Sequence, residues 1–410
     1  MDSNPRGQKL DFSNTEFAFA YKSDAQLQRT FRLFKMLGSN FLSKVGPPLV
    51  TFALKLGLPV QGIIRRTIFD IFCGGTSLED TSDRSQELFA SKVLTILDYS
   101  VEGKSTEESF NATRDEIIRT VRHGAADDAV AFSAMKVTGI ADAELLAKRD
   151  AGRELSKEEI ASLDRSKERL KAVCKVAFEL GQPVFVDAEE SWIQKTIDVW
   201  TEEMMAEFNK QKPIVYQTVQ MYRHDRLAYL KNLIAESKKS GHFIGIKVVR
   251  GAYIEKENAR AMELGYGTPM QANKAATDRD YNAALRECIA NVDHVALCAG
   301  THNEESAALL AVLLDEKGIA RDHPHVVFAQ LLGMSDHISF NLAHNGYRSA
   351  KYLPYGPVKA VLPYLFRRAA ENTSIAGQSS REVELLRKEV QRRVCSEVPK
   401  IVFSGKVFPL

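Results

Sequence analysis

The first part of the chain is patterned like a set of amphipathic helices. Between about residues 14 and 121, apolar residues recur mostly at steps of three and four, as at Leu27, Phe31 and Phe34. Such spacing places apolar side chains on one face of a helix. We therefore expect residues 1–125 to form an N-terminal helical region.

Beyond about residue 129 the pattern changes to short apolar runs that alternate with charged, helix-like stretches. The candidate strands are residues 130–137, 184–187, 214–221, 243–249, 295–299, 326–332, 338–342 and 352–353. Strands that alternate with helices indicate βαβ units and a parallel sheet. Eight strands over about 225 residues predict a (β/α)8 barrel of the TIM type. We place this barrel at residues 126–375 and a C-terminal helical tail at residues 376–410.

A doubly wound nucleotide-binding fold is the main alternative to the barrel. Folds of that kind hold phosphates with a GxGxxG or a Walker A motif, because the glycines let the backbone approach the phosphate groups. Neither motif occurs in this sequence. We therefore favour the barrel.

Composition and charge narrow the classes of function. The net charge of +2 gives no electrostatic case for binding nucleic acid. The five cysteines are scattered without CxxC or Cys-His spacing, so we expect neither a disulfide framework nor a metal site, and a reducing compartment. The N-terminus lacks the apolar stretch of a signal peptide. The apolar run at residues 49–58 is too short to span a bilayer. We expect a cytoplasmic protein.

Polar side chains follow nearly every predicted strand. Functional residues of (β/α)8 barrels lie at the C-terminal ends of the strands. The candidates, in chain order, are Lys136, Asp187, Glu189, Gln220, Lys247, Arg250, Gly251, Ala252, Thr301, His302, Gln330 and Tyr352. Taken singly, Asp187 could cap a helix and His302 could be an ordinary hydrogen-bond partner. Polar residues at so many strand ends, with two inward-facing lysines that would be costly to leave unpaired, indicate one site.

The stretch at residues 364–372 predicts a helix with a distinctive polar face. Because residues three and four apart share a helix face, one face would carry Tyr364, Arg367, Arg368 and Glu371. Adjacent guanidiniums repel each other, and each can clamp a carboxylate with two hydrogen bonds. We interpret this face as the seat of a small carboxylate, with a solvated basic patch as the alternative. Pro363 is expected to kink the helix.

Together, these motifs resemble the proline dehydrogenase family. They are VDAE at residues 186–189, QMY at 220–222, KVVRGAY at 247–253, HN at 302–303, QLLGM at 330–334, and residues 352–372. They occur in the family's order and are most similar to the mitochondrial-type branch. The resemblance implies a distorted (β/α)8 barrel that binds FAD without a Rossmann domain.

The resemblance also implies a role for each position. Arg367 and Arg368 would bind the carboxylate of L-proline, with Lys136 as a further contact. The ring would be enclosed by Leu331, Tyr352 and Tyr364. Asp187 and Lys247 are the expected catalytic residues, with Asp187 holding Lys136 and the tyrosines in place. The expected FAD contacts are Ala188, Gln220, Lys247, Arg250, Gly251, Ala252, Thr301, His302 and Glu371.

The reaction implied is the first step of proline catabolism to glutamate. L-Proline would be oxidised to 1-pyrroline-5-carboxylate by hydride transfer to flavin N5, with electrons passed on to a quinone. A quinone acceptor implies a peripheral contact with the inner membrane, which would be the mitochondrial one in a eukaryotic source.

Three alternatives remain open at this stage. Hydroxyproline is the nearest other substrate, although Tyr352 occupies the wall that should exclude a ring hydroxyl. A Schiff-base aldolase would use Lys247 as its nucleophile. A non-catalytic barrel would be a binding module without flavin.

Overall fold

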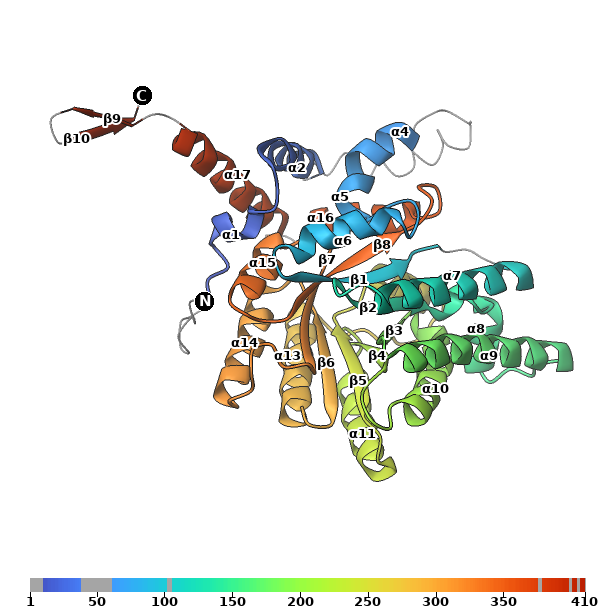
Figure 1. Cartoon of the computed structure of the whole chain (residues 1–410). Helices are drawn as coiled ribbons and strands as arrows, with labels where there is room; N and C mark the ends of the chain where they lie inside the picture. The colour runs from blue at the N-terminus through green and yellow to red at the C-terminus, as the bar shows by residue number, and fades with distance from the viewer. Residues whose placement is uncertain are drawn as a thin grey trace.

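Eight parallel strands close into a barrel (Figure 1). The computed structural model describes residues 10–37, 61–101, 105–374, 378–397, 400–403 and 406–409. The strands pair in chain order, and β8 returns to pair with β1. They are β1 Val93–Tyr99, β2 Val130–Lys136, β3 Val184–Asp187, β4 Val215–Gln220, β5 Ile244–Val249, β6 Val295–Gly300, β7 Val326–Leu331 and β8 Ser349–Tyr355. The predicted (β/α)8 fold is confirmed.

One strand was missed and another was wrongly assigned. β1 lies inside the region predicted to be helical, so the barrel begins at Val93, ahead of the expected boundary at residue 126. Residues 338–342, predicted as a strand, belong to α15, Asp336–His344, whose residues are buried on nearly every side. Periodicity cannot tell a short buried strand from a short buried helix, because neither has a polar face. The two errors cancelled in the count of eight.

Helices cover the outside of the barrel (Figure 1). They are α7 Glu107–Ala125, η2 Val137–Gly139, α8 Ala143–Asp150, α9 Lys157–Leu180, α10 Ser191–Phe208, α11 Arg226–Ser240, α12 Ile254–Leu264, α13 Lys274–Ala290, α14 Glu304–Glu316 and α15. Local signals set their ends. Ser156 and Glu159 form a reciprocal capping box at the start of α9, and Gly181 ends this helix in a left-handed conformation with φ of 70°.

Helices from both ends of the chain pack together at one side of the barrel. The N-terminal elements are α1 Thr15–Phe19, α2 Asp24–Leu37, α4 Gln61–Ile64, the π-helical turn η1 Arg65–Phe69, α5 Asp70–Phe72 and α6 Asp80–Phe89. The C-terminal elements are α16 Leu362–Ser374, α17 Gln378–Glu397 and a hairpin of β9 Lys400–Phe403 and β10 Lys406–Pro409. α17 lies against α1 and α2 (Figure 1). Phe19, Leu27 and Phe34 share an apolar cluster with Leu365 and Leu386.

α16 starts differently from the prediction. Pro363 is the second residue of the helix and not an interior one. A proline in the first turn loses no hydrogen bond, because the N–H groups there have no intrahelical partner. Pro363 therefore begins the helix, and the predicted kink is wrong.

The barrel interior is layered, with an aromatic floor below a polar mouth. Phe132 stacks on Phe185 with ring centroids 4.4 Å apart, and Tyr216 meets both rings edge-on. Side chains two residues apart on a strand face the same way. Two residues beyond Phe185 on β3 comes Asp187, and two beyond Tyr216 on β4 comes Thr218. The floor thus separates the packed core from the polar groups at the C-terminal strand ends.

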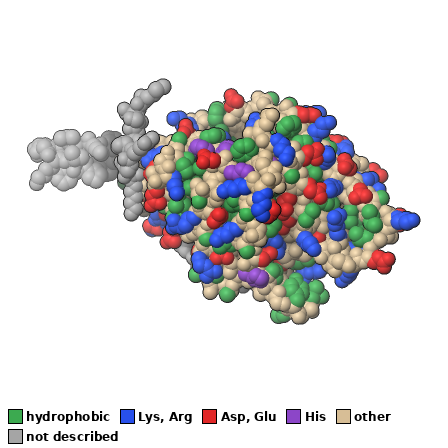
Figure 2. Space-filling model, turned by 90° about the horizontal axis from the view of Figure 1, so that it is seen from below, with side chains coloured by type: hydrophobic (Ala, Val, Ile, Leu, Met, Phe, Trp, Pro, Cys, Tyr) green, Lys and Arg blue, Asp and Glu red, His purple; other side chains and the backbone are tan. Residues whose placement is uncertain are grey.

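The surface carries both signs of charge. On the face drawn in Figure 2, basic and acidic side chains are interspersed over the described residues and are not gathered by sign. This distribution agrees with a chain of 55 Lys and Arg residues against 53 Asp and Glu residues. Within the described part of the chain, no helix combines the length and the apolar character needed to cross a membrane.

Candidate functional site

Asp187, at the end of β3, is the centre of the polar mouth. Lys247 on β5 forms an ion pair with Oδ1 and donates a hydrogen bond to it. The hydroxyl of Thr218 donates to the same oxygen at 3.4 Å. Tyr352 on β8 donates to Oδ2 at 2.8 Å. Burial by itself would raise the pKa of Asp187, but the charges of Lys247 and Lys136 outweigh it and lower the pKa. The structure therefore joins three predicted site residues from β3, β5 and β8 around one ionised carboxylate.

Lys247 is held on all sides. Its ammonium lies 4.9 Å from the ring centroid of Phe185 and 5.1 Å from that of Tyr352, in addition to the pair with Asp187. A Schiff-base aldolase needs a lysine amine that is free to attack a carbonyl carbon. The amine of Lys247 is already engaged by a carboxylate and two aromatic faces. These contacts therefore argue against the aldolase.

Lys136, at the end of β2, lies beside a carboxylate that sequence reasoning missed. Its ammonium is 3.7 Å from Oδ2 of Asp98, the residue that continues the inward face of β1. Ser100 donates a hydrogen bond to the same oxygen. Asp98 is only 1% exposed, and burial raises its pKa although Lys136 opposes the shift. The signal was present as a polar residue after an apolar run, but this run had been assigned to a helix.

The arginine face of α16 covers the mouth. The guanidinium of Arg368 lies 5.0 Å from the ring centroid of Tyr364, and both side chains are buried. Arg368 also acts on His302 at the end of β6, whose pKa is lowered to about 3 by burial, by Lys351 and by Arg368. A buried guanidinium is not part of a solvated patch, so that alternative is wrong for Arg368.

The neighbouring arginine acts on the loop that follows β5. Arg367 is half-buried, and its charge acts on Tyr253 in the loop after β5. Burial raises the pKa of Tyr253, while Lys136 and Arg367 oppose that rise. The charges of Arg367 and Lys136 therefore act on the same phenol. The side chain of Glu371, an expected FAD contact, lies outside the described side chains.

Arg250, after β5, is fixed by three hydrogen bonds. Its guanidinium donates to Asp278 at 2.7 Å, to Thr301 at 2.6 Å and to Ser306 at 3.0 Å. Its central carbon is also 4.3 Å from the ring centroid of Tyr281. Two of the five N–H groups of this guanidinium are left over for a ligand by this count. Arg250 and Thr301, both expected FAD contacts, are therefore joined directly.

The loop that follows Arg250 needs a glycine. Gly251 has φ of 131°, and a Cβ there would lie 2.4 Å from the ring of Tyr222. Ala252 is exposed beside it. A larger residue at position 251 would displace Tyr222, and the left-handed backbone would be strained. The glycine thus allows this loop to fold tightly over the end of β4.

Gln220, at the end of β4, presents an acceptor without a protein partner. Its Nε2 donates to the backbone carbonyl of Glu189 at 3.0 Å. Its Oε1 accepts no hydrogen bond from the residues that the structure describes, although Gln220 is only 2% exposed. Buried acceptors are normally satisfied. The orphaned oxygen therefore fits a ligand that brings an N–H group, and half-buried Ala188 follows the end of the neighbouring strand β3.

His302 is supported from the C-terminal helix α17. Its Nδ1 lies 3.0 Å from Oγ of Ser335, a residue with a left-handed φ of 52°. The N–H of Ser335 donates to both carboxylate oxygens of Glu382 on α17, at 3.0 and 3.1 Å. Ser335 and Glu382 were not predicted, because the contact joins positions 47 residues apart in the chain.

Leu331 completes the predicted set. It ends β7 and packs against both the barrel interior, which includes Tyr352, and the cluster that includes Tyr364. Its position between the two tyrosines is the one expected for a wall of the substrate pocket.

Comparison with known proteins gives a consistent result. A family model described as proline dehydrogenase matches residues 81–381, which include the whole barrel and α16. The mitochondrial proline dehydrogenase 1 of Dictyostelium discoideum is 30% identical over 438 residues, covering 96% of this chain and 76% of that protein. A hydroxyproline dehydrogenase of Xenopus laevis is 36% identical over 247 residues, covering 59% of this chain and 53% of that protein.

Solved structures share the fold. The crystal structure of proline utilization A from Bdellovibrio bacteriovorus, inactivated by N-propargylglycine, matches with a TM-score of 0.70 and 21% identity. The match covers 94% of this chain but 42% of that one, so this chain spans less than half of that protein's length. With the family model matching most of the chain and these relatives beside it, the chain belongs to the proline dehydrogenase family.

Proposed function

We propose that this protein oxidises L-proline to 1-pyrroline-5-carboxylate with FAD as its cofactor. The observation that carries the proposal is the buried guanidinium of Arg368 on α16, which lies over a mouth lined by Asp187, Lys247 and Tyr352. A cationic lid above an aromatic and charge-balanced pocket suits a small, ring-shaped amino acid with one carboxylate.

The substrate carboxylate belongs on the arginine side. Arg367 and Arg368 can each offer a pair of parallel N–H donors, and Lys136 adds a point charge from the end of β2. Tyr352, Tyr364 and Leu331 form the apolar wall around the ring. Fixing the carboxylate and the ring together sets the orientation of the carbon next to nitrogen, and this alignment accounts for much of the rate that a binding site can supply.

We assign FAD to the C-terminal ends of β4, β5 and β6. The orphaned Oε1 of Gln220 awaits an N–H donor, and Arg250 retains donors for an anionic group. His302, whose pKa is about 3, stays neutral and can accept or donate a hydrogen bond without adding charge. When bound, FAD supplies the chemistry by accepting a hydride. Ala188, Gly251, Ala252, Thr301 and the side chain of Glu371 are proposed as the further contacts.

Asp187 and Lys247 organise the pocket between cofactor and substrate. The carboxylate holds the Tyr352 phenol at 2.8 Å, so the ring wall keeps one orientation. The amine of Lys247 is fixed by its ion pair with Asp187 and would place a cation beside the flavin when it is bound. Lys247 is buried and Asp187 is largely shielded from solvent, which strengthens their electrostatic effect.

Proline is favoured over hydroxyproline by the state of Tyr352. The phenol is 9% exposed and its hydroxyl is already engaged by Asp187. The phenol proton is committed to Asp187, so Tyr352 cannot donate a hydrogen bond to a ring hydroxyl, and the aromatic ring lies beside the ammonium of Lys247.

A quinone is the proposed electron acceptor, which calls for contact with a membrane. α12, which begins directly after the cofactor loop, exposes Met262 by 87% and Leu264 by 57%, with Tyr266 exposed just beyond. These apolar side chains suit a peripheral contact at the side of the mouth. The membrane would be the inner membrane, facing the cytoplasm of a bacterium or lying in the mitochondrion of a eukaryote.

A spectrum tests the proposal. The purified protein should be yellow, acid precipitation should release FAD into the supernatant, and L-proline added without oxygen should bleach the flavin band. Borohydride trapping of a carbonyl substrate on Lys247 tests the aldolase in parallel. A colourless protein that still turns over proline would overturn the cofactor assignment, and a yellow protein that proline leaves unchanged would overturn the substrate.

A further inference from the structure

Asp98 completes a ring of alternating charge at the mouth of the barrel. Around the first five strands, the inward positions at the C-terminal ends include Asp98 on β1, Lys136 on β2, Asp187 on β3 and Lys247 on β5. Asp98 pairs with Lys136, while Asp187 pairs with Lys247. Within this ring the charges of two carboxylates offset those of two ammoniums. The positive charges of Arg367 and Arg368 on α16 therefore stay available to an anionic substrate.

The two carboxylate oxygens of Asp98 have different contacts. Oδ2 accepts from Ser100 and faces the ammonium of Lys136 at 3.7 Å. Oδ1 accepts no hydrogen bond from the described residues, although the side chain is 1% exposed. A buried carboxylate with an unsatisfied oxygen is destabilising by itself. Its position is therefore better explained by what it does to Lys136 than by a contribution to folding.

Lys136 stands between two acids. Its charge acts on Asp187 as well as on Asp98, although the structure gives Asp187 its direct ammonium contact from Lys247. Without Asp98, the charge of Lys136 would still act on the carboxylates of Asp187 and Glu189. An ammonium drawn to Asp187 would compete with Lys247 and Tyr352 for the same two oxygens and would leave the substrate side of the mouth.

We propose that Asp98 is a positioning residue that holds Lys136 toward the substrate carboxylate and away from Asp187. The proposal rests on the proposed function, because it assigns Lys136 to the carboxylate of L-proline. Two effects of removing the Asp98 charge oppose each other. Loss of a negative charge alone should strengthen anion binding, whereas displacement of Lys136 should weaken it.

The test measures binding of cyclopentanecarboxylate to the FAD-loaded enzyme by calorimetry. This probe keeps the five-membered ring and the carboxylate but lacks the nitrogen, so it cannot be oxidised to an imine. Asp98→Asn should bind it about tenfold more weakly, the size of an ordinary coupling between charged neighbours. In a Lys136→Met background the same substitution should leave affinity unchanged or improve it. The neutral cyclopentanecarboxamide should respond to neither change.

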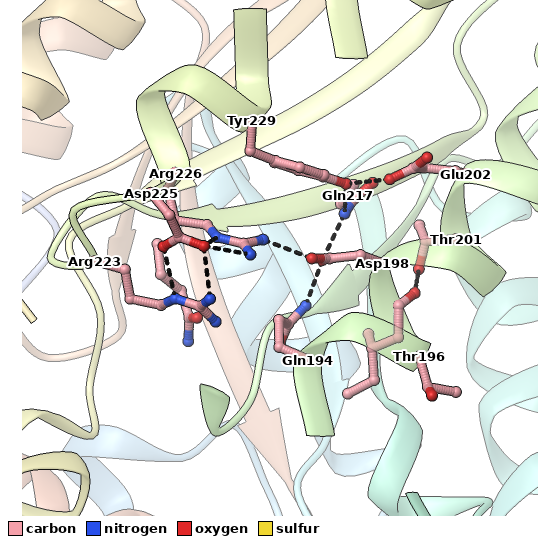
Figure 3. A network of polar contacts seen from close by, with 12 residues as sticks. Gln194, Thr196, Asp198, Thr201, Glu202, Gln217, Arg223, Asp225, Arg226 and Tyr229 are labelled. Atoms are coloured by element: carbon pink, nitrogen blue, oxygen red, sulfur yellow. Dashed lines mark hydrogen bonds and ion pairs between the residues drawn. The ribbon is translucent and has the colours of Figure 1, made fainter. Parts of the chain in front are cut away.

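Asp198→Asn is the matched control. Asp198 is also a buried carboxylate in an ion pair, with Arg226 at 2.5 Å, but it belongs to α10, which packs against β4, and lies in a network with Gln194 and Gln217 (Figure 3). Loss of the Asp198 charge should lower the melting temperature. Its effect on the affinity for cyclopentanecarboxylate should have the same sign with Lys136 present and in the Lys136→Met background. If Asp98→Asn does not fold, Ser100→Ala serves instead and should weaken binding about threefold, again only when Lys136 is present.

The outcomes separate the two proposals. Tighter binding in Asp98→Asn, or an equal loss with and without Lys136, overturns the positioning role. A wild-type enzyme that binds no cyclopentanecarboxylate and oxidises no proline overturns the proposed function itself. If Asp98→Asn weakens binding with Lys136 present but strengthens it in the Lys136→Met background, the effect on affinity has reversed sign. A merely structural role would not produce this result.

Discussion

Tyr352 on β8 and Asp187 on β3 are joined by a hydrogen bond of 2.8 Å across the mouth of the barrel. The two strands are not neighbours, since β1 and β2 lie between them. The bond therefore ties Tyr352, the proposed wall of the substrate pocket, to the carboxylate that also anchors Lys247. Removing the ring and removing only its hydroxyl should have different consequences.

Tyr352→Ser should shift the preference from proline toward 4-hydroxyproline. The smaller side chain leaves room for the ring hydroxyl and offers it a hydrogen bond, while the loss of the aromatic wall raises the KM for proline. An apolar pocket rejects an added hydroxyl by only about 100-fold, so the shift should be measurable but incomplete. The measurement is the ratio of kcat/KM for the two substrates. Tyr352→Phe, which keeps the wall, is the control, and an unchanged ratio in Tyr352→Ser would remove this residue from the ring wall.

Replacing either lid arginine by methionine should raise the KM for proline more than it lowers FAD content. Loss of one partner from a desolvated, hydrogen-bonded charge pair costs about 2–5 kcal/mol. Steady-state kinetics and the flavin-to-protein absorbance ratio give the two quantities for Arg367→Met and Arg368→Met. Arg279→Met, on the exposed side of α13 with 70% of its side chain accessible, should leave both unchanged. Unaltered proline kinetics in both lid variants would move the carboxylate site elsewhere.

The site residues at the strand ends were predictable from the sequence, because a polar residue at the end of an apolar run is a local signal. Asp187, Gln220 and Lys247 each follow a short apolar run, and the barrel brings such ends to one face. Asp98 follows a run of the same kind but was missed, because that run lies within the region predicted to be helical and was not recognised as a strand. The prediction of the site depended more on the order of the strands than on their exact bounds.

Contacts between distant segments could not be read in the same way. Glu382 reaches Ser335 from a helix that follows the barrel, and nothing local in either residue specifies the pairing. Arg250 was expected to face the cofactor, yet its bonds to Asp278 and Ser306 depend on how α13 and α14 pack. Periodicity gives the faces of helices, but packing decides which faces meet.

Glu382→Ala should weaken FAD retention more than it raises the KM for proline. The carboxylate holds the N–H of Ser335, and Ser335 contacts His302, an expected FAD contact. Loss of a buried acceptor for that N–H costs about 1–3 kcal/mol, and it loosens a backbone held at a left-handed φ. FAD affinity is measured by fluorescence quenching on re-addition to the apoenzyme. Glu384→Ala, whose side chain is 59% exposed on the same helix, is the control; equal FAD affinity in both variants would contradict the link.

Glu189→Gln should stabilise the protein increasingly as pH rises. Burial raises the pKa of Glu189 to about 7, despite hydrogen bonds from the N–H and hydroxyl of Thr138. The unfolded chain loses this proton near pH 4.5, its ordinary value, while the folded chain keeps it until about pH 7. Stability therefore falls as pH rises between these two values, and the full cost is present above pH 7. Glutamine stays neutral and can still accept from the Thr138 N–H and donate to its hydroxyl.

Denaturant unfolding at pH 5 and pH 8 measures this effect. The advantage of Glu189→Gln over the wild type should grow by about 2 kcal/mol between the two pH values. Asp225→Asn supplies the control, because the pKa of Asp225 is lowered to about 2 from an ordinary value of 3.8, so both its folded and unfolded titrations lie below pH 5. Its stability difference from the wild type should stay constant over the same interval. A constant difference for Glu189→Gln as well would mean that Glu189 is ionised in the folded protein already at pH 5, and that Thr138 and Lys136 offset its burial.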